Sequence, residues 1–131
     1  SEHASFLTEV VGEFKRNGIR TSIFMDPVPL LIEKAAKTGT DRIELYTESY
    51  AVEYAKGNKG EARKYGEAAL TAAEYGLGVN AGHDLNLDNL NFFVCEVPEV
   101  LEVSIGHALI SEALYFGLEN VIGMYLQKLV R

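Results

Sequence analysis

The chain alternates short β-branched runs with helix-like segments, and this alternation constrains its fold more than any other feature. Four runs are predicted to be strands, at residues 20–25, 42–46, 78–81 and 101–105. They recur at the spacing of consecutive strand–helix units, which form a parallel sheet through right-handed crossovers. The sequence therefore predicts the α/β class, built from parallel (β/α) units.

The helical segments follow from apolar residues at helical spacing and from glycines that end them. They are predicted at about residues 6–17, 28–37, 60–75, 87–93, 108–116 and 118–129. The stretch from Thr47 to Lys59 lacks a clear period, so we expect a long loop there with a helical turn around residues 50–54. The tyrosines near this stretch are expected to pack or to contact another subunit.

The number of units points to part of a larger architecture. A short extra helix after the last predicted strand is a feature of (β/α)₈ TIM barrels, where it helps to bind phosphate. Such a barrel needs eight units, and this chain of 131 residues has four. We therefore expect a single domain over residues 1–131 that forms half of a barrel, with four strands and their flanking helices.

Composition excludes several kinds of partner. A net charge of −7 argues against a nucleic-acid or anionic-membrane surface, which requires a basic face. We find no signal peptide at the start and no apolar run long enough to cross a bilayer. Cys95, the one cysteine, lies in an apolar run and is expected to be a buried, reduced thiol. These features favour a cytoplasmic protein.

Two Gly-His pairs mark the predicted functional edge. Gly82-His83 and Gly106-His107 each follow a predicted strand, and the carboxyl ends of parallel strands share one edge of the sheet. The same edge should also carry Asp26, Glu44 and Asp84. Acid–base and anion-binding groups are therefore expected to gather there.

Each candidate has a structural alternative. His83 is the best proton carrier, but it could instead be a loop histidine that caps backbone groups. Glu44 must point away from its apolar strand neighbours, towards a functional site or into a salt bridge with Arg42 or Arg20. Gly106-His107 suits an anion at a helix N-terminus, or is an ordinary helix start.

A metal site is a weaker possibility at the same edge. The side chains that could form it are His83, Asp84, His107, Asp26 and Glu44. No HxH or HExxH spacing supports such a site. We therefore expect neither a metal nor an organic cofactor.

Four strings in this order resemble the C-terminal half of the pyridoxine 5′-phosphate synthase family. They are residues 22–26 (SIFMD), 43–47 (IELYT), 79–83 (VNAGH) and 105–108 (IGHA). The third and fourth strings together are specific, and the match extends from about Phe6 to the end of the chain. The family fold is a (β/α)₈ barrel, so the resemblance accounts for the four missing units.

The resemblance implies an activity and roles for five residues. The reaction condenses 1-deoxy-D-xylulose 5-phosphate with 3-amino-2-oxopropyl phosphate to pyridoxine 5′-phosphate. His83 would be the proton donor and Glu44 would stabilise the transition state, while Asp84, Gly106 and His107 would bind the amino-ketone phosphate. The family usually has glycine where this chain has Asp84, and histidine and glycine where it has Tyr46 and Glu48.

The resemblance also implies partners. The remaining catalytic groups belong to the N-terminal half-barrel, which would be required for activity, and the family tends to form homo-oligomers. Two other functions stay open: a non-catalytic phosphate-binding half-barrel that self-associates through an exposed apolar inner face, and a metal-assisted aldolase or hydrolase.

Overall fold

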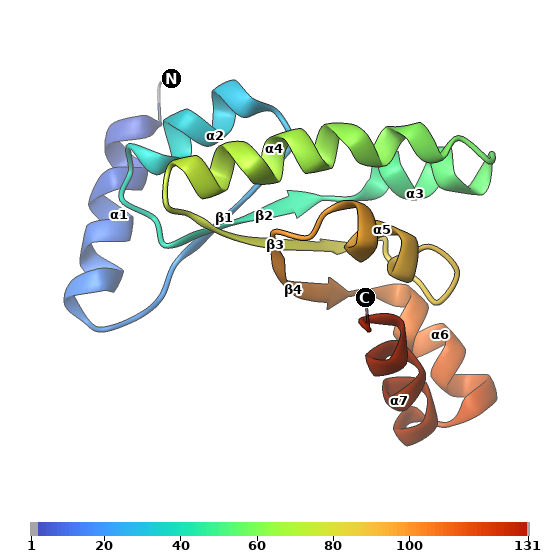
Figure 1. Ribbon diagram of the computed structural model, residues 1–131. Helices are drawn as coiled ribbons and strands as arrows, with labels where there is room; N and C mark the ends of the chain where they lie inside the picture. Colours follow the sequence, from blue (N-terminus) through green and yellow to red (C-terminus); the bar gives the residue numbers. More distant parts are fainter. Residues whose placement is uncertain (1–2, 131) are drawn as a thin grey trace.

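A four-stranded parallel sheet, in the order β1-β2-β3-β4, organises the computed structural model, which describes residues 3–130 (Figure 1). The strands are β1 (Ser22–Met25), β2 (Arg42–Tyr46), β3 (Gly78–His83) and β4 (Val100–Ile105). The predicted α/β class is confirmed, and the sheet with its helices corresponds to half of a (β/α)₈ barrel. All four carboxyl ends therefore lie at one edge, as the sequence predicted.

Helices connect the strands and flank the sheet. They are α1 (Ala4–Arg16), α2 (Pro29–Ala36), α3 (Glu48–Ala55), α4 (Ala62–Glu74), α5 (Leu90–Glu96), α6 (His107–Phe116) and α7 (Leu118–Lys128), with a 3₁₀ turn η1 at Lys59–Glu61. In Figure 1, α2, α4 and α5 lie over one face of the sheet, whereas α6 and α7 stand beside β4. No helix within residues 3–130 has both the length and the apolar character that a bilayer crossing needs.

Element boundaries differ from the sequence prediction, most clearly after β2 and near the end of β3. The expected loop after Thr47 is instead the eight-residue helix α3. Strand β3 extends to His83 rather than ending at Ala81, because Gly82 and His83 continue the register with Ser104 and Ile105 of β4. Helix α5 begins later than predicted, at Leu90, because Asn86 caps a turn by accepting from the N–H groups of Asp88 and Asn89.

The core lies between the helices and one face of the sheet. Ile43 and Leu45 of β2, and Val79 and Ala81 of β3, are at most 1% exposed, as the alternation of side chains along strands requires. Helix α4 packs onto β3 through alanines, whose small side chains allow close approach. Residues of this chain thus build a complete core on the helical side of the sheet.

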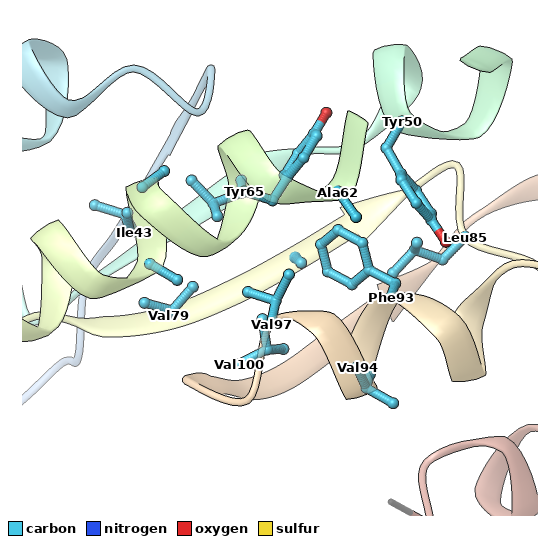
Figure 2. Packing of buried hydrophobic residues seen from close by; sticks show 14 of the residues in the cluster. Ile43, Tyr50, Ala62, Tyr65, Val79, Leu85, Phe93, Val94, Val97 and Val100 are labelled. Atoms are coloured by element: carbon cyan, nitrogen blue, oxygen red, sulfur yellow. The ribbon is translucent and has the colours of Figure 1, made fainter. Parts of the chain in front are cut away.

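Aromatic side chains fill the carboxyl end of this core (Figure 2). The ring of Tyr50 lies 4.9 Å from that of Phe93, and the rings of Tyr65 and Phe93 are 5.4 Å apart. The Tyr50 hydroxyl donates to the carbonyl oxygen of Asn89 at 2.7 Å, so its polar end is satisfied. Tyr50 and Tyr65 therefore pack in the core, one of the two roles expected for tyrosines here.

The opposite face of the sheet, which would line a barrel, is polar rather than apolar. Nη1 of Arg42 donates to Oδ1 of Asn80 at 2.8 Å and lies 2.9 Å from Oε2 of Glu102. Glu102 also pairs with Arg20 at 3.3 Å. The prediction of an exposed apolar inner face was therefore wrong, because polar and charged side chains of β2, β3 and β4 bond to one another across it.

The prediction that Cys95 is buried was also wrong. Cys95 is a free thiol and is exposed. The buried side of α5 is formed by Leu90, Phe93 and Val94, at the i, i+3 and i+4 positions of a helical stripe. Cys95 falls outside this stripe, so its side chain faces solvent.

Asp41 joins the beginning of the sheet to α1. Its Oδ2 accepts hydrogen bonds from the N–H of Thr21 at 2.8 Å and from the Thr21 hydroxyl at 3.0 Å. Its Oδ1 lies 3.0 Å from Nζ of Lys15. The Thr21 N–H bond, followed by the Lys15 contact, lowers the pKa of Asp41 to about 2.

This pKa predicts an acid-sensitive contribution to stability. Because the folded pKa lies below the unfolded value, the contribution is present above about pH 4 and is lost as the pH falls towards about 2. Asp41→Asn should remove it, so the difference in free energy of unfolding between wild type and variant should shrink across this window. Urea unfolding at several pH values measures the difference. Glu9→Gln, an exposed change on α1, should show no such trend.

Gly82 supplies a second stability prediction. A Cβ atom built on Gly82 would lie 2.4 Å from the carbonyl oxygen of Ser104, whereas one on Gly123 would meet nothing within 4 Å. Gly82→Ala should therefore lower the free energy of unfolding by about 1–3 kcal/mol or more. The matched Gly123→Ala change in α7 should be neutral or stabilising by up to about 1 kcal/mol. Denaturant unfolding tests both, and equal effects would contradict this packing argument.

Candidate functional site

The central feature of the carboxyl edge is a histidine–carboxylate pair. Nε2 of His83, at the end of β3, lies 3.4 Å from Oε1 of Glu44, in the middle of β2. The His83 side chain is 55% exposed and that of Glu44 only 17%, so the carboxylate is enclosed and the imidazole is accessible. The two groups can form an ion pair when the imidazole carries a proton.

The alternative salt bridges for Glu44 are not formed. Arg42 and Arg20 both pair with Glu102, on the neighbouring strand β4. Phe24 instead borders the pair, with its ring 5.4 Å from the His83 imidazole and its own side chain half exposed. The sequence analysis did not identify Phe24, although its register opposite Glu44 in the paired strands would have placed it there.

Gly106 allows the junction of β4 and α6 to approach His83 closely. The N–H of Gly106 donates to the carbonyl oxygen of His83 at 3.1 Å. A Cβ atom on Gly106 would lie 3.1 Å from that oxygen and 3.3 Å from the Cβ of His83. Gly106 therefore fastens the main chain of His83 directly to the beginning of α6.

The N-terminus of α6 is open to a ligand. No side chain among residues 3–130 caps it, so the first-turn N–H groups that follow Gly106 lack the partner that a capping residue supplies. His107 is exposed at this end and, with His83 and Asp84, lines a surface groove of about 370 Å³ that also reaches α3. A helix N-terminus bordered by histidine is suited to a phosphate group.

Asp84 lies at the junction of this groove with the core. Its N–H donates to Oγ1 of Thr47 at 3.1 Å, and its carbonyl oxygen accepts from Nδ2 of Asn89 at 3.3 Å. One carboxylate oxygen, Oδ2, is enclosed and has no hydrogen-bond partner among residues 3–130. The main chain of Asp84 is thus anchored, whereas its side chain is not fully satisfied.

Asp26 does not take part in the His83–Glu44 pair. It follows β1 with its side chain exposed, and its carbonyl oxygen accepts from the N–H of Val28 in a turn. Within residues 3–130, no three or more His, Cys, Asp and Glu side chains come close enough to hold a metal ion. The set considered from the sequence as metal ligands does not converge.

Tyr46 adds a phenol to the same edge. Its hydroxyl donates to Oε2 of Glu48 at 2.6 Å, and its ring lies 5.3 Å from that of Phe24. The hydrogen bond to Glu48, together with desolvation and the Glu48 charge, raises the pKa of Tyr46 to about 12. Tyr46 is therefore a neutral hydrogen-bond donor throughout the physiological range.

Known proteins resemble the chain over its whole length. The family model described as pyridoxal phosphate biosynthesis protein PdxJ matches residues 1–131. A pyridoxine 5′-phosphate synthase from Flavobacterium johnsoniae is 63% identical over 98% of this chain and 54% of its own length. Those of Christiangramia forsetii and Cytophaga hutchinsonii are 62% and 54% identical, over 98% and 97% of this chain and 54% and 53% of their own. The chain thus spans about half the length of the curated relatives it matches.

The Tyr46–Glu48 bond yields a spectroscopic prediction. Glu48→Gln replaces the charged acceptor with a neutral amide, so the pKa of Tyr46 should fall towards its ordinary value near 10. In ¹³C-tyrosine NMR spectra at about pH 11, Tyr46 should be protonated in the wild type and ionised in the variant. Glu53→Gln, on the same helix but paired with Lys56 and Asn58, should leave Tyr46 unchanged. Identical Tyr46 titrations in all three proteins would contradict this account.

Proposed function

Because the chain belongs to the PdxJ family of pyridoxal phosphate biosynthesis proteins, we propose that it is part of a pyridoxine 5′-phosphate synthase. The reaction would condense 1-deoxy-D-xylulose 5-phosphate with 3-amino-2-oxopropyl phosphate to pyridoxine 5′-phosphate. Ring closure with loss of water and phosphate needs groups that move protons and groups that bind anions. The carboxyl edge of this sheet offers both kinds of group side by side.

The His83–Glu44 pair is the observation that carries the proposal. An accessible imidazole can deliver a proton to a departing hydroxyl or to a ring atom. The enclosed Glu44 carboxylate, 3.4 Å away, would stabilise positive charge in the transition state and hold the imidazole in place. We assign His83 as the proton donor and Glu44 as the stabilising group.

Gly106, His107 and Asp84 would bind the amino-ketone phosphate. The N–H groups at the uncapped start of α6 suit the phosphate, and the close approach of Gly106 to His83 would bring that phosphate near the proton donor. The carboxylate of Asp84 would repel a phosphate, so we assign it to the other end of this substrate, which carries an amino group. The unpaired Oδ2 supports this assignment.

The rest of the active site would come from the other half of the barrel. Side chains on α6 and α7 form an apolar stripe that the described residues leave exposed, consisting of Ile110, Leu114, Leu118, Ile122 and Leu126. At the opposite edge, Phe6 and Leu7 of α1 are similarly exposed. Four further (β/α) units, of the length by which the relatives exceed this chain, would cover both edges and complete the barrel.

The same exposed stripe also supports the second candidate, a phosphate-binding half-barrel that self-associates without catalysis. Exposed apolar patches of this kind mark protein contacts but do not identify the partner. The two candidates differ in what they require of His83. In the synthase His83 moves a proton, whereas in the binding protein it only borders the ligand.

His83→Asn in the complete, full-length enzyme separates these candidates. Loss of the proton donor should lower kcat by about 10²- to 10⁴-fold, as removal of a general acid does. Formation of pyridoxine 5′-phosphate from the two substrates measures the rate, and binding of inorganic phosphate, followed by calorimetry, should persist. His3→Asn, at the exposed start of α1, is the matched control. A variant that retains full turnover would show that His83 is not the proton donor.

A further inference from the structure

Thr47 occupies an unusual position for a helix-capping residue. It is the N-cap of α3, where a threonine hydroxyl normally accepts a hydrogen bond from the first turn of its own helix. No side chain caps α3, and Thr47 is fully buried. Its hydroxyl instead bonds to residue 84, which directly follows β3.

That partner brings Thr47 to the main chain around His83. The N–H of Thr47 donates to the carbonyl oxygen of Gly82 at 3.1 Å, and Oγ1 of Thr47 accepts from the N–H of Asp84 at 3.1 Å. Gly82 and Asp84 are the residues immediately before and after His83. One buried side chain and its own amide thus hold both neighbours of the proposed proton donor.

The His83 side chain itself has few restraints. Within residues 3–130 its imidazole lies 3.4 Å from the Glu44 carboxylate and beside the half-exposed Phe24 ring, and more than half of the side chain is exposed. Its main chain is held on the other side by Gly106, whose N–H donates to the His83 carbonyl oxygen. The direction of the imidazole therefore depends mainly on how firmly its backbone is fixed.

Thr47 is itself anchored in the core. The hydroxyl of Tyr65, which is fully buried, donates to the carbonyl oxygen of Tyr46 at 2.8 Å, and the Thr47 carbonyl accepts from the N–H of Ala51 at 3.0 Å. Burial raises the pKa of Tyr65, so the phenol keeps the proton that it donates. A continuous set of hydrogen bonds thus leads from the aromatic core to the backbone of His83.

We propose that Thr47 is a positioning residue that sets the direction of the His83 imidazole through the backbone on both sides of it. This inference rests on the proposed function, because it assumes that His83 transfers a proton. Without the Thr47 hydroxyl, the N–H of Asp84 is left unpaired in a partly buried place, and the segment shifts to find another acceptor. The imidazole then leaves its place beside Glu44.

Three variants of the complete enzyme test this proposal. Thr47→Val keeps the shape and the N–H but removes the hydroxyl, and should lower kcat by about 10- to 100-fold with little change in KM, as a misplaced catalytic group does. Thr47→Ser restores the acceptor and should recover most of the rate. If the Thr47→Val protein does not fold, Thr47→Cys takes its place, because a thiol is a weak hydrogen-bond acceptor and the change is smaller.

Thr38→Val is a matched control. Thr38 is also buried, and its hydroxyl accepts from the N–H of Thr40 at 3.3 Å, at the opposite end of the sheet. This change removes the same kind of hydrogen bond, together with the one that the Thr38 hydroxyl donates to the carbonyl oxygen of Ala35 at 2.7 Å, so it should lower stability and leave kcat unchanged. If Thr38→Val slows the enzyme as much as Thr47→Val does, the effect is general destabilisation and the proposal is overturned.

NMR of the His83 ring provides a readout that does not depend on turnover. The ¹⁵N and ¹³C resonances of the His83 ring should change in Thr47→Val and remain as in the wild type in Thr47→Ser and Thr38→Val. Unchanged kcat and unchanged His83 resonances in Thr47→Val would overturn the positioning role. Full turnover in His83→Asn would instead overturn the proton-donor role, while the resonances would still report whether Thr47 fixes the ring.

Discussion

The close contact between β3 and β4 at Gly82 is the constraint on which the carboxyl edge of the sheet depends. Any side chain at this position would meet the carbonyl oxygen and Cβ of Ser104 at less than 3 Å. Because β3 lies between β2 and β4, a displacement there would break pairing on both sides. The same contact brings His83 level with Ile105, so that Gly106 can bond to its carbonyl oxygen. Strand pairing and the geometry of the candidate site therefore both require that residue 82 has no side chain.

The two faces of the sheet differ in chemical character. The helical face is a closed apolar core that stabilises the chain through burial of Ile43, Leu45 and Val79. The opposite face carries complementary charges, with Glu102 shared between Arg20 and Arg42. Arg42 of β2 bonds to both Asn80 of β3 and Glu102 of β4, so these three strands are joined across this face by side chains. The candidate site lies where this polar face reaches the carboxyl edge.

Much of this arrangement could be predicted from the sequence, because the signals for it are local. The β-branched runs gave the four strands, and the glycines beside His83 and His107 marked the functional edge. Helix α3 could not be predicted in the same way. Its residues Tyr50 and Tyr54 bond through their hydroxyls to carbonyl oxygens of Asn89 and Asp88, which are distant in the sequence. Tertiary contacts, rather than a local period, stabilise this helix.

For other differences between prediction and structure, the sequence contains a signal, but the surrounding residues obscure it. Cys95 follows three apolar residues and so resembles core, but helical periodicity in α5 assigns the buried positions to Phe93 and Val94. The partner of Glu44 depends on which of several charged side chains the folded sheet places next to it. Sequence reasoning left a salt bridge to arginine open, whereas in the structure Glu44 of β2 lies beside His83 at the end of the neighbouring strand β3. Only the three-dimensional register decides between such alternatives.

The hydrogen bonds that hold this edge together are made mostly by main-chain atoms, and this has a consequence for sequence variation. Tyr46 contributes its carbonyl oxygen to the bond with Tyr65, and Asp84 contributes its N–H to the bond with Thr47. Their side chains take no part in either bond. Substitutions at 46 and 84 can therefore change the preference for a ligand without removing these hydrogen bonds. Gly82, Thr47 and Gly106 have no such freedom, because their own side chains, or the absence of one, are what the scaffold uses.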